Sequence, residues 1–111
     1  MVVDPQVIKE LKSLGGDGSV FSRVQSLFLT KVPEALADIT QHAHNQDAAA
    51  LADRVHGLRS MFMTIGAIKA SRACEQLETA ARIGAINQNS ALIESVVHEA
   101  QAAMTAVKRY A

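Results

Sequence analysis

The chain has 111 residues, enough for one domain with a single hydrophobic core and too few for two. Eleven basic residues balance eleven acidic ones and no basic stripe is visible, so neither nucleic acid nor an anionic membrane is an expected partner. Hydrophobic residues make up 49% of the chain, aromatic residues only 4%, and Trp is absent, a composition that favours close-packed helices over a sheet.

The chain also lacks the usual signals for export or membrane insertion. No run approaches the roughly 18 apolar residues of a membrane span, and the opening MVVDPQV lacks the basic and apolar regions of a signal peptide. The one cysteine, Cys74, can form no internal disulfide, which fits a reducing compartment. We therefore expect a cytoplasmic protein with no membrane contact by this domain.

Hydrophobic periodicity predicts helices and no strand, at residues 5–14, 19–44, 47–65, 68–83 and 90–109. Asp4 followed by Pro5 is a typical helix opening, with an N-cap and a proline at the first helical position. The glycine-rich segment 15–19 lacks the GK[ST] ending and the preceding strand of a phosphate-binding loop, so it is interpreted as a connector. Ser19 is expected to cap the long second helix, and a kink or break is expected near Pro33, because proline removes a backbone donor.

The second half of the chain predicts three more helices. Asp47 is expected to cap the first of them and Gly66 to end it in a left-handed conformation, so that the next helix returns antiparallel beside it. Gly84 closes that helix, and a loop at 85–89 leads to the last one, which either the last residue of the loop or Ser90 caps. We predict a single all-α domain over residues 1–111, an antiparallel up-down four-helix bundle with a short extra N-terminal helix across one end.

The stretch LADRVHGLRSMFMTIGA, residues 51–67, places a histidine opposite an apolar seam. The seam has a 4-3-4-3 spacing and consists of Leu51, Val55, Leu58, Phe62 and Ile65. At about 100° per residue, His56 points roughly 140° away from the centre of this seam, into solvent. Arg59 lies one turn further on, near enough for its guanidinium to reach a group that the imidazole carries. The outward surface around them is expected to include Ala52, Asp53, Ser60, Met63 and Thr64.

These residues resemble the histidine-containing phosphotransfer (HPt) domains of bacterial and plant phosphorelays. The family core reads roughly H-x-L-K-G-S, then a Gly-Ala turn some ten residues after the histidine, then a small residue and a Leu-Glu pair on the next helix. The matching positions here are His56-Gly57-Leu58-Arg59-Ser60-Met61, Gly66-Ala67, Cys74, Leu77 and Glu78. The resemblance covers nearly the whole chain, since its length, helix order and the Asp47 cap also look like the family.

The resemblance implies that His56 accepts a phosphoryl group from a receiver-domain aspartate and passes it to another receiver. Arg59, where the family has Lys, would stabilise the phosphoryl oxygens. Glu78 lies where the family often has a Gln or Glu that hydrogen-bonds the imidazole; we expect it to hold Nδ1 and leave Nε2 free to attack. A solvated Glu78 paired with Arg82 at i+4 is an equally good interpretation.

The implied partners are receiver domains and a sensor histidine kinase. No cofactor of its own is expected, and Mg²⁺ would belong to the receiver, because no carboxylate cluster resembles a metal site. The chain is too short for an ATP-binding domain and has no nucleotide signature, so an autonomous kinase is not expected. The resemblance implies a phosphotransfer intermediate, freestanding or the C-terminal module of a hybrid sensor kinase.

The chain departs from the family pattern at Ser60, where the family has Gly, and a Gly occupies position 57. An alternative function follows from Ser60, namely an interaction module with the HPt fold that docks a receiver or kinase without efficient phosphotransfer. The expected docking face consists of Ala52, Gly57, Ser60, Met63 and Thr64.

Other reactive residue types lack a context that favours a function. We interpret His42, His44 and His98 as surface histidines and Cys74 as a small core residue. A metal-binding bundle would need inward-facing Glu-x-x-His pairs, which the sequence does not contain.

Overall fold

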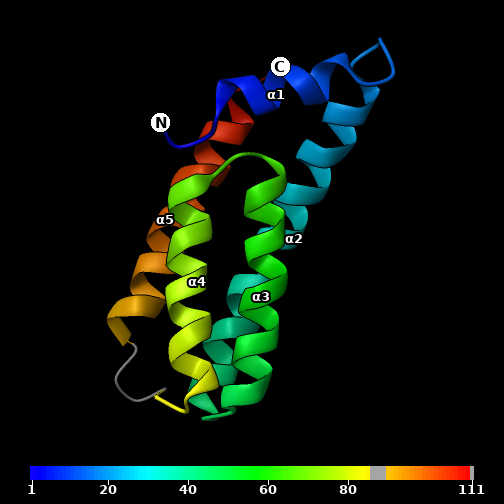
Figure 1. Cartoon of the computed structure of the whole chain (residues 1–111). Coiled ribbons are helices and arrows are strands. Elements are labelled where there is room, and N and C mark those ends of the chain that lie inside the picture. The colour runs from blue at the N-terminus through cyan, green and yellow to red at the C-terminus, as the bar shows by residue number, and fades with distance from the viewer. Residues whose placement is uncertain (86–89, 111) are drawn as a thin grey trace.

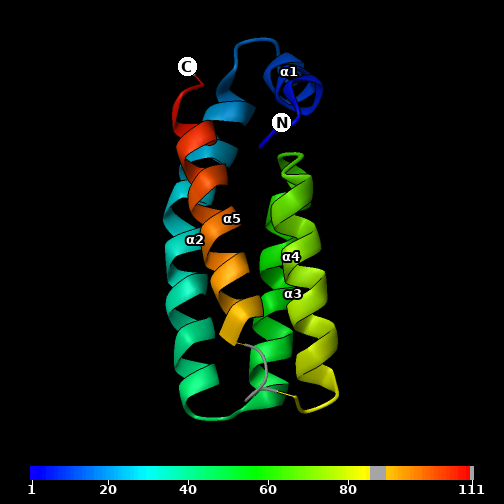
Figure 2. The same cartoon turned by 90° about the vertical axis from the view of Figure 1, so that its left-hand side faces the viewer.

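The computed structural model describes residues 1–85 and 90–110 and is all-helical there (Figure 1). The helices are α1 (Pro5–Ser13), α2 (Ser19–His44), α3 (Ala48–Thr64), α4 (Ile68–Arg82) and α5 (Ser90–Lys108). Helices α2 to α5 form an elongated bundle, and α1 lies across one end of it, where both chain termini are also found (Figures 1 and 2). The predicted fold, a four-helix bundle with an extra N-terminal helix, is confirmed. None of the described helices is long and apolar enough to cross a membrane.

The N-terminal segment is tied to the turn between α3 and α4. The Asp4 carboxylate caps α1 by accepting a hydrogen bond from the backbone N–H of Gln6 at 2.9 Å. The backbone N–H of Asp4 donates to the carbonyl of Gly66 at 3.1 Å. Val3 and Ile8 are buried in the core. These contacts hold α1 across one end of the bundle, as the sequence predicted.

The start of α2 differs from its prediction. Ser19 is the first residue of the helix and not its cap, because Gly18 occupies the N-cap position with φ of 80°. The carboxylate of Asp17 takes the capping role, accepting from the backbone N–H of Ser19 at 3.0 Å. Asp17 lies one residue before the N-cap position. Its carboxylate still reaches a free N–H of the helix, because the turn at Gly18 folds the chain toward the helix.

Helix α2 continues through Pro33, so of the expected kink or break the break does not occur, and the kink stays a prediction. Pro33 itself is exposed, while its neighbours Val32 and Ala35 are fully buried. The carbonyl that loses its helical partner can therefore be hydrated, and packing on the other face holds the two halves together.

The core is mainly aliphatic. Phe28 and Phe62 meet edge to face with ring centroids 5.8 Å apart, and Phe21 and Tyr110 do so at 6.3 Å. All members of the predicted α3 seam are buried, as expected: Leu51, Val55, Leu58, Phe62 and Ile65. The prediction that Ala52 belongs to the docking face was wrong, because this residue is 0% exposed. Helix α3 packs against both α2 and α4, so its buried arc is wider than a single seam and extends to Ala52.

Gly66 makes the α3–α4 turn as predicted, with φ of 73°. The N–H of Ala67 donates to the carbonyl of Phe62 at 2.9 Å, which closes the end of α3. A Cβ on Gly66 would lie 2.8 Å from Cβ of Asp4 and 3.0 Å from Cγ2 of Val7. Both the backbone conformation and the close approach of the N-terminal segment therefore require glycine.

Gly84 also has a positive φ, of 76°, after the end of α4. The predicted loop at 85–89 and its cap by Asn89 or Ser90 lie, apart from Ala85 and the backbone of Ser90, outside the described residues.

Gly66→Ala should lower the free energy of unfolding by about 2 to 4 kcal/mol, because it adds a left-handed alanine and a steric overlap. Gly57→Ala is the matched control: Gly57 is helical with nothing within 4 Å of an added Cβ, so this variant should gain up to about 1 kcal/mol. Urea unfolding measures both values. A Gly66→Ala protein as stable as the wild type would contradict this account of the turn.

Candidate functional site

His56 lies on the exposed face of α3, and its side chain is 59% exposed. Its Nδ1 atom is 3.1 Å from both Oε1 and Oε2 of Glu78 on α4. Within the described residues Nε2 has no hydrogen-bond partner. The imidazole is therefore held at one nitrogen by a carboxylate and presents the other to solvent.

The sequence left open whether Glu78 hydrogen-bonds the His56 ring or pairs with Arg82, and its carboxylate does both. It contacts the His56 ring, and its Oε2 also accepts from Nε of Arg82 at 3.2 Å and from a terminal guanidinium nitrogen at 3.1 Å. The Glu78 side chain is only 14% exposed. Burial raises the pKa of this carboxyl, but the hydrogen bonds from His56 and Arg82 outweigh burial and leave the pKa below its ordinary value. Glu78 is thus an ionised acceptor at neutral pH.

Arg59 approaches the same carboxylate more loosely. One of its terminal nitrogens is 3.9 Å from Oε1 of Glu78, beyond hydrogen-bond distance. Its Nε is buried and has no hydrogen-bond partner in the described part of the chain. The side chain is 32% exposed. Arg59 therefore has donors to spare beside the imidazole.

Four of the five predicted docking residues are exposed: Gly57, Ser60, Met63 and Thr64. The Ser60 hydroxyl donates to the carbonyl of His56 at 3.4 Å, and that of Thr64 donates to the carbonyl of Ser60 at 3.0 Å. Both hydroxyls are thus bonded back onto their own helix, which leaves methyl and thioether groups as the more prominent features of this face.

Hollows flank the histidine helix on both sides. On the α4 side a hollow of about 400 Å³ is lined by Arg59, Glu75, Glu78, Thr79, Arg82 and Ile83. On the α2 side an apolar hollow of about 190 Å³ is lined by Val24, Leu27, Phe28, Met61, Thr64 and Ile65. The residues that α2 contributes to this hollow depend on how α2 packs against α3, which the pattern of a single helix does not show.

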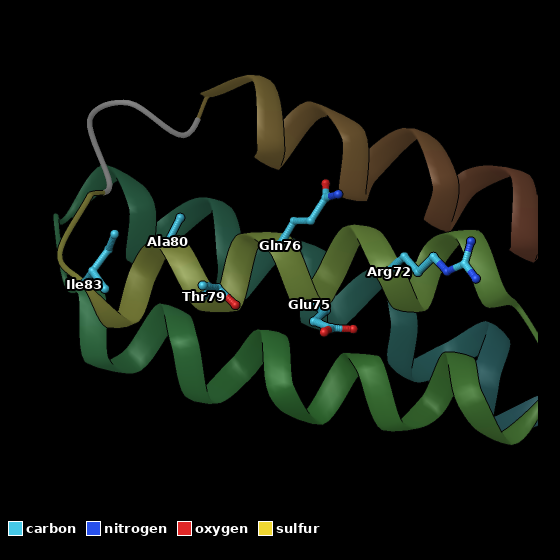
Figure 3. Close-up of a pocket in the computed structure, with 6 residues that line it drawn as sticks. All are labelled: Arg72, Glu75, Gln76, Thr79, Ala80 and Ile83. Carbon is cyan, nitrogen blue, oxygen red and sulfur yellow. The ribbon is translucent and has the colours of Figure 1, made fainter.

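A larger hollow, of about 590 Å³, lies on the outer face of α4 (Figure 3). It is lined by Arg72, Glu75, Gln76, Thr79, Ala80 and Ile83, and no hydrogen bond joins any of these side chains to His56. In Figure 3 the Gln76 side chain extends toward α5 and that of Glu75 toward α3. The hollow is adjacent to the histidine site, because it shares Glu75, Thr79 and Ile83 with the hollow on the α4 side of α3.

Sequence reasoning missed Asp53 as a site residue. Its Oδ1 atom is 3.3 Å from a terminal nitrogen of Arg82, which the sequence had placed only as a possible partner of Glu78. Both residues were visible as charges on helical surfaces, but their meeting depends on how α3 and α4 are aligned.

The remaining candidates stay outside the site. Cys74 is buried, and burial raises the pKa of its thiol to about 12, against a smaller opposite effect of Arg59, which confirms it as a core residue. His44 and His98 are exposed and His42 is half-buried. Across residues 1–85 and 90–110, no group of three or more His, Cys, Asp or Glu side chains is placed to hold a metal ion.

The stability of the bundle should depend on the ionisation of Glu78. Because its pKa is lower in the folded protein than the unfolded value of about 4.3, its stabilisation is present above that pH and is lost as pH falls through the folded pKa. In urea unfolding, the stability difference between wild type and Glu78→Gln should be largest near about pH 6 and shrink toward about pH 3.

Glu75→Gln is the matched control, since Glu75 is exposed on the same helix and has no ion-pair partner within the described residues. A stability difference for Glu78→Gln that does not change with pH would contradict the assignment of an ionised, hydrogen-bonded carboxylate.

The fold has a close counterpart among solved structures. The crystal structure of histidine-containing phosphotransfer protein B (HptB) from Pseudomonas aeruginosa PAO1 superposes with a TM-score of 0.88. The match covers 99% of this chain and 97% of that protein at 24% sequence identity, so it bears on the fold alone. None of the curated proteins compared with the chain matches it.

The sequence itself gives the family. The family model described as "Hpt domain" matches residues 23–110, which include all of α3, α4 and α5 and therefore the whole His56 site. The chain therefore belongs to the Hpt domain family, and its function is histidine phosphotransfer in a phosphorelay, with partners such as receiver domains.

Proposed function

We propose that His56 is the residue that carries the phosphoryl group, accepting it from a receiver-domain aspartate and passing it to a second receiver. The observation that supports this most directly is the asymmetry of the imidazole. Nδ1 is held by an ionised, largely buried Glu78, whereas Nε2 is open to solvent within the described residues. An imidazole with its proton on Nδ1 has its lone pair on Nε2, the nitrogen that a partner can reach.

The transfer is a displacement at phosphorus. The Nε2 lone pair of His56 attacks, a P–N bond forms, and the P–O bond to the donor aspartate breaks, so that the aspartate leaves as a carboxylate. The attack makes the ring cationic, because Nδ1 keeps its proton. Glu78 then faces an imidazolium and the hydrogen bond becomes an ion pair, which stabilises the charge that develops in the transition state. Attack by the aspartate of the next receiver reverses these steps.

Arg59 is the residue we assign to the phosphoryl oxygens. Its buried Nε has no hydrogen-bond partner in the described chain, and its nearest carboxylate is 3.9 Å away, so binding an anion costs it no existing hydrogen bond. A guanidinium can donate two parallel hydrogen bonds to a phosphoryl group, where a lysine would act as a point charge. We assign no cofactor to this chain and place the Mg²⁺ of the reaction on the receiver.

We propose that receivers dock over the exposed face of α3 that Gly57, Ser60, Met63 and Thr64 form around His56. The apolar hollow between α2 and α3 continues this face through Thr64 and supplies the apolar contact area that a transient interface needs. We also place the protein in the cytoplasm, where phosphorelay kinases and receivers meet.

His56→Gln should abolish labelling by a receiver domain that carries ³²P on its aspartate, because glutamine has no nucleophilic ring nitrogen. Wild type should acquire a label that is labile in acid and stable in alkali. His98→Gln is the control, since His98 is exposed on α5, and it should be labelled like wild type.

Full labelling of His56→Gln would refute the assignment of the phosphoacceptor. Receiver binding without any transfer of label to wild type would instead favour the alternative function, a docking module, to which Ser60 in place of the family glycine points.

Arg59→Ala should slow transfer by about tenfold, the equivalent of about one charge-assisted hydrogen bond in the transition state. Arg54→Ala is the control on the same helix, because the Arg54 guanidinium is already paired with Asp38 at 2.9 Å. Rates of label transfer from a phosphorylated receiver measure the effect, and urea unfolding checks the fold. An unchanged rate for Arg59→Ala would remove Arg59 from the mechanism.

A further inference from the structure

The His56–Glu78 pair is one end of a longer chain of charges across the surface of α3 and α4. Next to Glu78 lies Arg82, with three donor contacts: Nε at 3.2 Å and a terminal nitrogen at 3.1 Å from Oε2 of Glu78, and the same terminal nitrogen at 3.3 Å from Oδ1 of Asp53. Asp53 precedes His56 by three residues on α3, and Arg82 follows Glu78 by four on α4. The charges of Glu78, Arg82 and Asp53 therefore alternate in sign, and together with His56 these side chains bridge the two helices twice.

Glu78 needs a cation for its role beside His56. A carboxylate that is only 14% exposed tends to bind a proton unless an opposite charge or hydrogen bonds hold it ionised. A protonated Glu78 could donate to Nδ1 of His56, which would place the ring proton on Nε2. The nitrogen that faces solvent would then carry no lone pair for attack. The state of Glu78 thus decides which ring nitrogen is the nucleophile.

The two arginines beside Glu78 are used differently. Both short contacts from arginine to Glu78 come from Arg82, and its position is fixed on the far side by Asp53. Arg59 stands 3.9 Å away with a buried Nε that has no partner within the described chain. Arg82 is engaged with protein carboxylates before any phosphoryl group arrives, whereas Arg59 is available for one.

We propose that Arg82, oriented by Asp53, is a positioning residue that keeps the Glu78 carboxylate ionised and directed at Nδ1, so that His56 presents Nε2 as its nucleophile. This inference rests on the proposed role of His56 as the phosphoacceptor. Arg82 itself acts through Glu78 and does not bind the phosphoryl group.

The test separates positioning from docking by using no receiver at all. Phosphoramidate, a small phosphoryl donor, transfers its phosphoryl group to Nε2 as its P–N bond breaks and ammonia leaves. The rate of phosphohistidine formation at position 56 is measured on the peptide that carries it, apart from any label on His42, His44 or His98. The tautomer of the His56 ring is read from its ¹⁵N chemical shifts in the unphosphorylated protein. The variants are Arg82→Gln, Arg82→Lys and Asp53→Asn. Arg72→Gln is the matched control, an exposed arginine on the same helix that has no ion-pair partner among the described residues.

Arg82→Gln should increase the fraction of His56 with its proton on Nε2 and slow phosphorylation by about tenfold, the typical scale for loss of an electrostatic or acid–base contribution. Arg82→Lys should restore the wild-type tautomer and bring the rate to within about threefold, because a point charge still holds the carboxylate ionised. Asp53→Asn should give a rate between those of wild type and Arg82→Gln. Arg72→Gln should match wild type in both measurements.

An Arg82→Gln protein with a wild-type tautomer would overturn the inference even if its rate fell, because a slower rate alone would mean that Arg82 binds the phosphodonor. An equal fall in Arg72→Gln would also overturn it, since the effect would then be one of general positive charge. A wild-type rate in Asp53→Asn would refute the part assigned to Asp53. Full labelling of His56→Gln by a phosphorylated receiver would instead refute the proposed function, and the tautomer measurement would remain valid on its own.

Discussion

The structure depends on the tight turn that joins α3 to α4, because this turn sets the alignment of the two helices. His56 and Glu78 each lie eleven residues from Ala67 in the turn, and Asp53 and Arg82 lie fourteen and fifteen residues from it. Antiparallel helices that leave a common turn bring residues at equal separations to the same height. A shift of α4 by one residue would rotate its side chains by about 100°, which would carry the carboxylate away from the imidazole. The requirement for glycine in the turn is thus also a requirement of the site.

Much of the fold followed from the sequence, because single-helix properties determine it. The 4-3-4-3 spacing identified the buried seam of α3, and the glycine at position 66 identified its end. The cap of α2 was wrong for a local reason, the glycine turn before Ser19, but the error at the site came from contacts between helices. Ala52 was placed outside because one helix projection cannot show that α3 is covered on two sides. Of the kink or break expected at Pro33, the break does not occur, and one helix viewed alone cannot show how far the buried residues on its opposite face compensate for the lost hydrogen bond.

The candidate site could likewise be predicted where it depends on a single helix, and not where it depends on contacts between two. The exposure of His56 and the nearness of Arg59 follow from positions on one helix. Glu78 was ambiguous because its partner at i+4 is visible in the sequence, whereas its partner on α3 depends on tertiary alignment. The Asp53–Arg82 contact was missed for that reason, although both charges were in view. The net charge of zero likewise gave no sign that acidic and basic side chains alternate locally, from Glu78 through Arg82 to Asp53.

Both ends of the described chain lie at the pole of the bundle that carries the α3–α4 turn (Figure 1). The C-terminal residues are fixed there, since Gln25 donates to the carbonyls of Val107 and Tyr110 at 2.9 and 2.7 Å. His56 is ten residues of helix from Gly66, about 15 Å along the axis. A flexible tether of about ten residues covers that span. A receiver joined covalently at either terminus would therefore reach the imidazole at high effective concentration, whereas one supplied in trans would have to find it by diffusion.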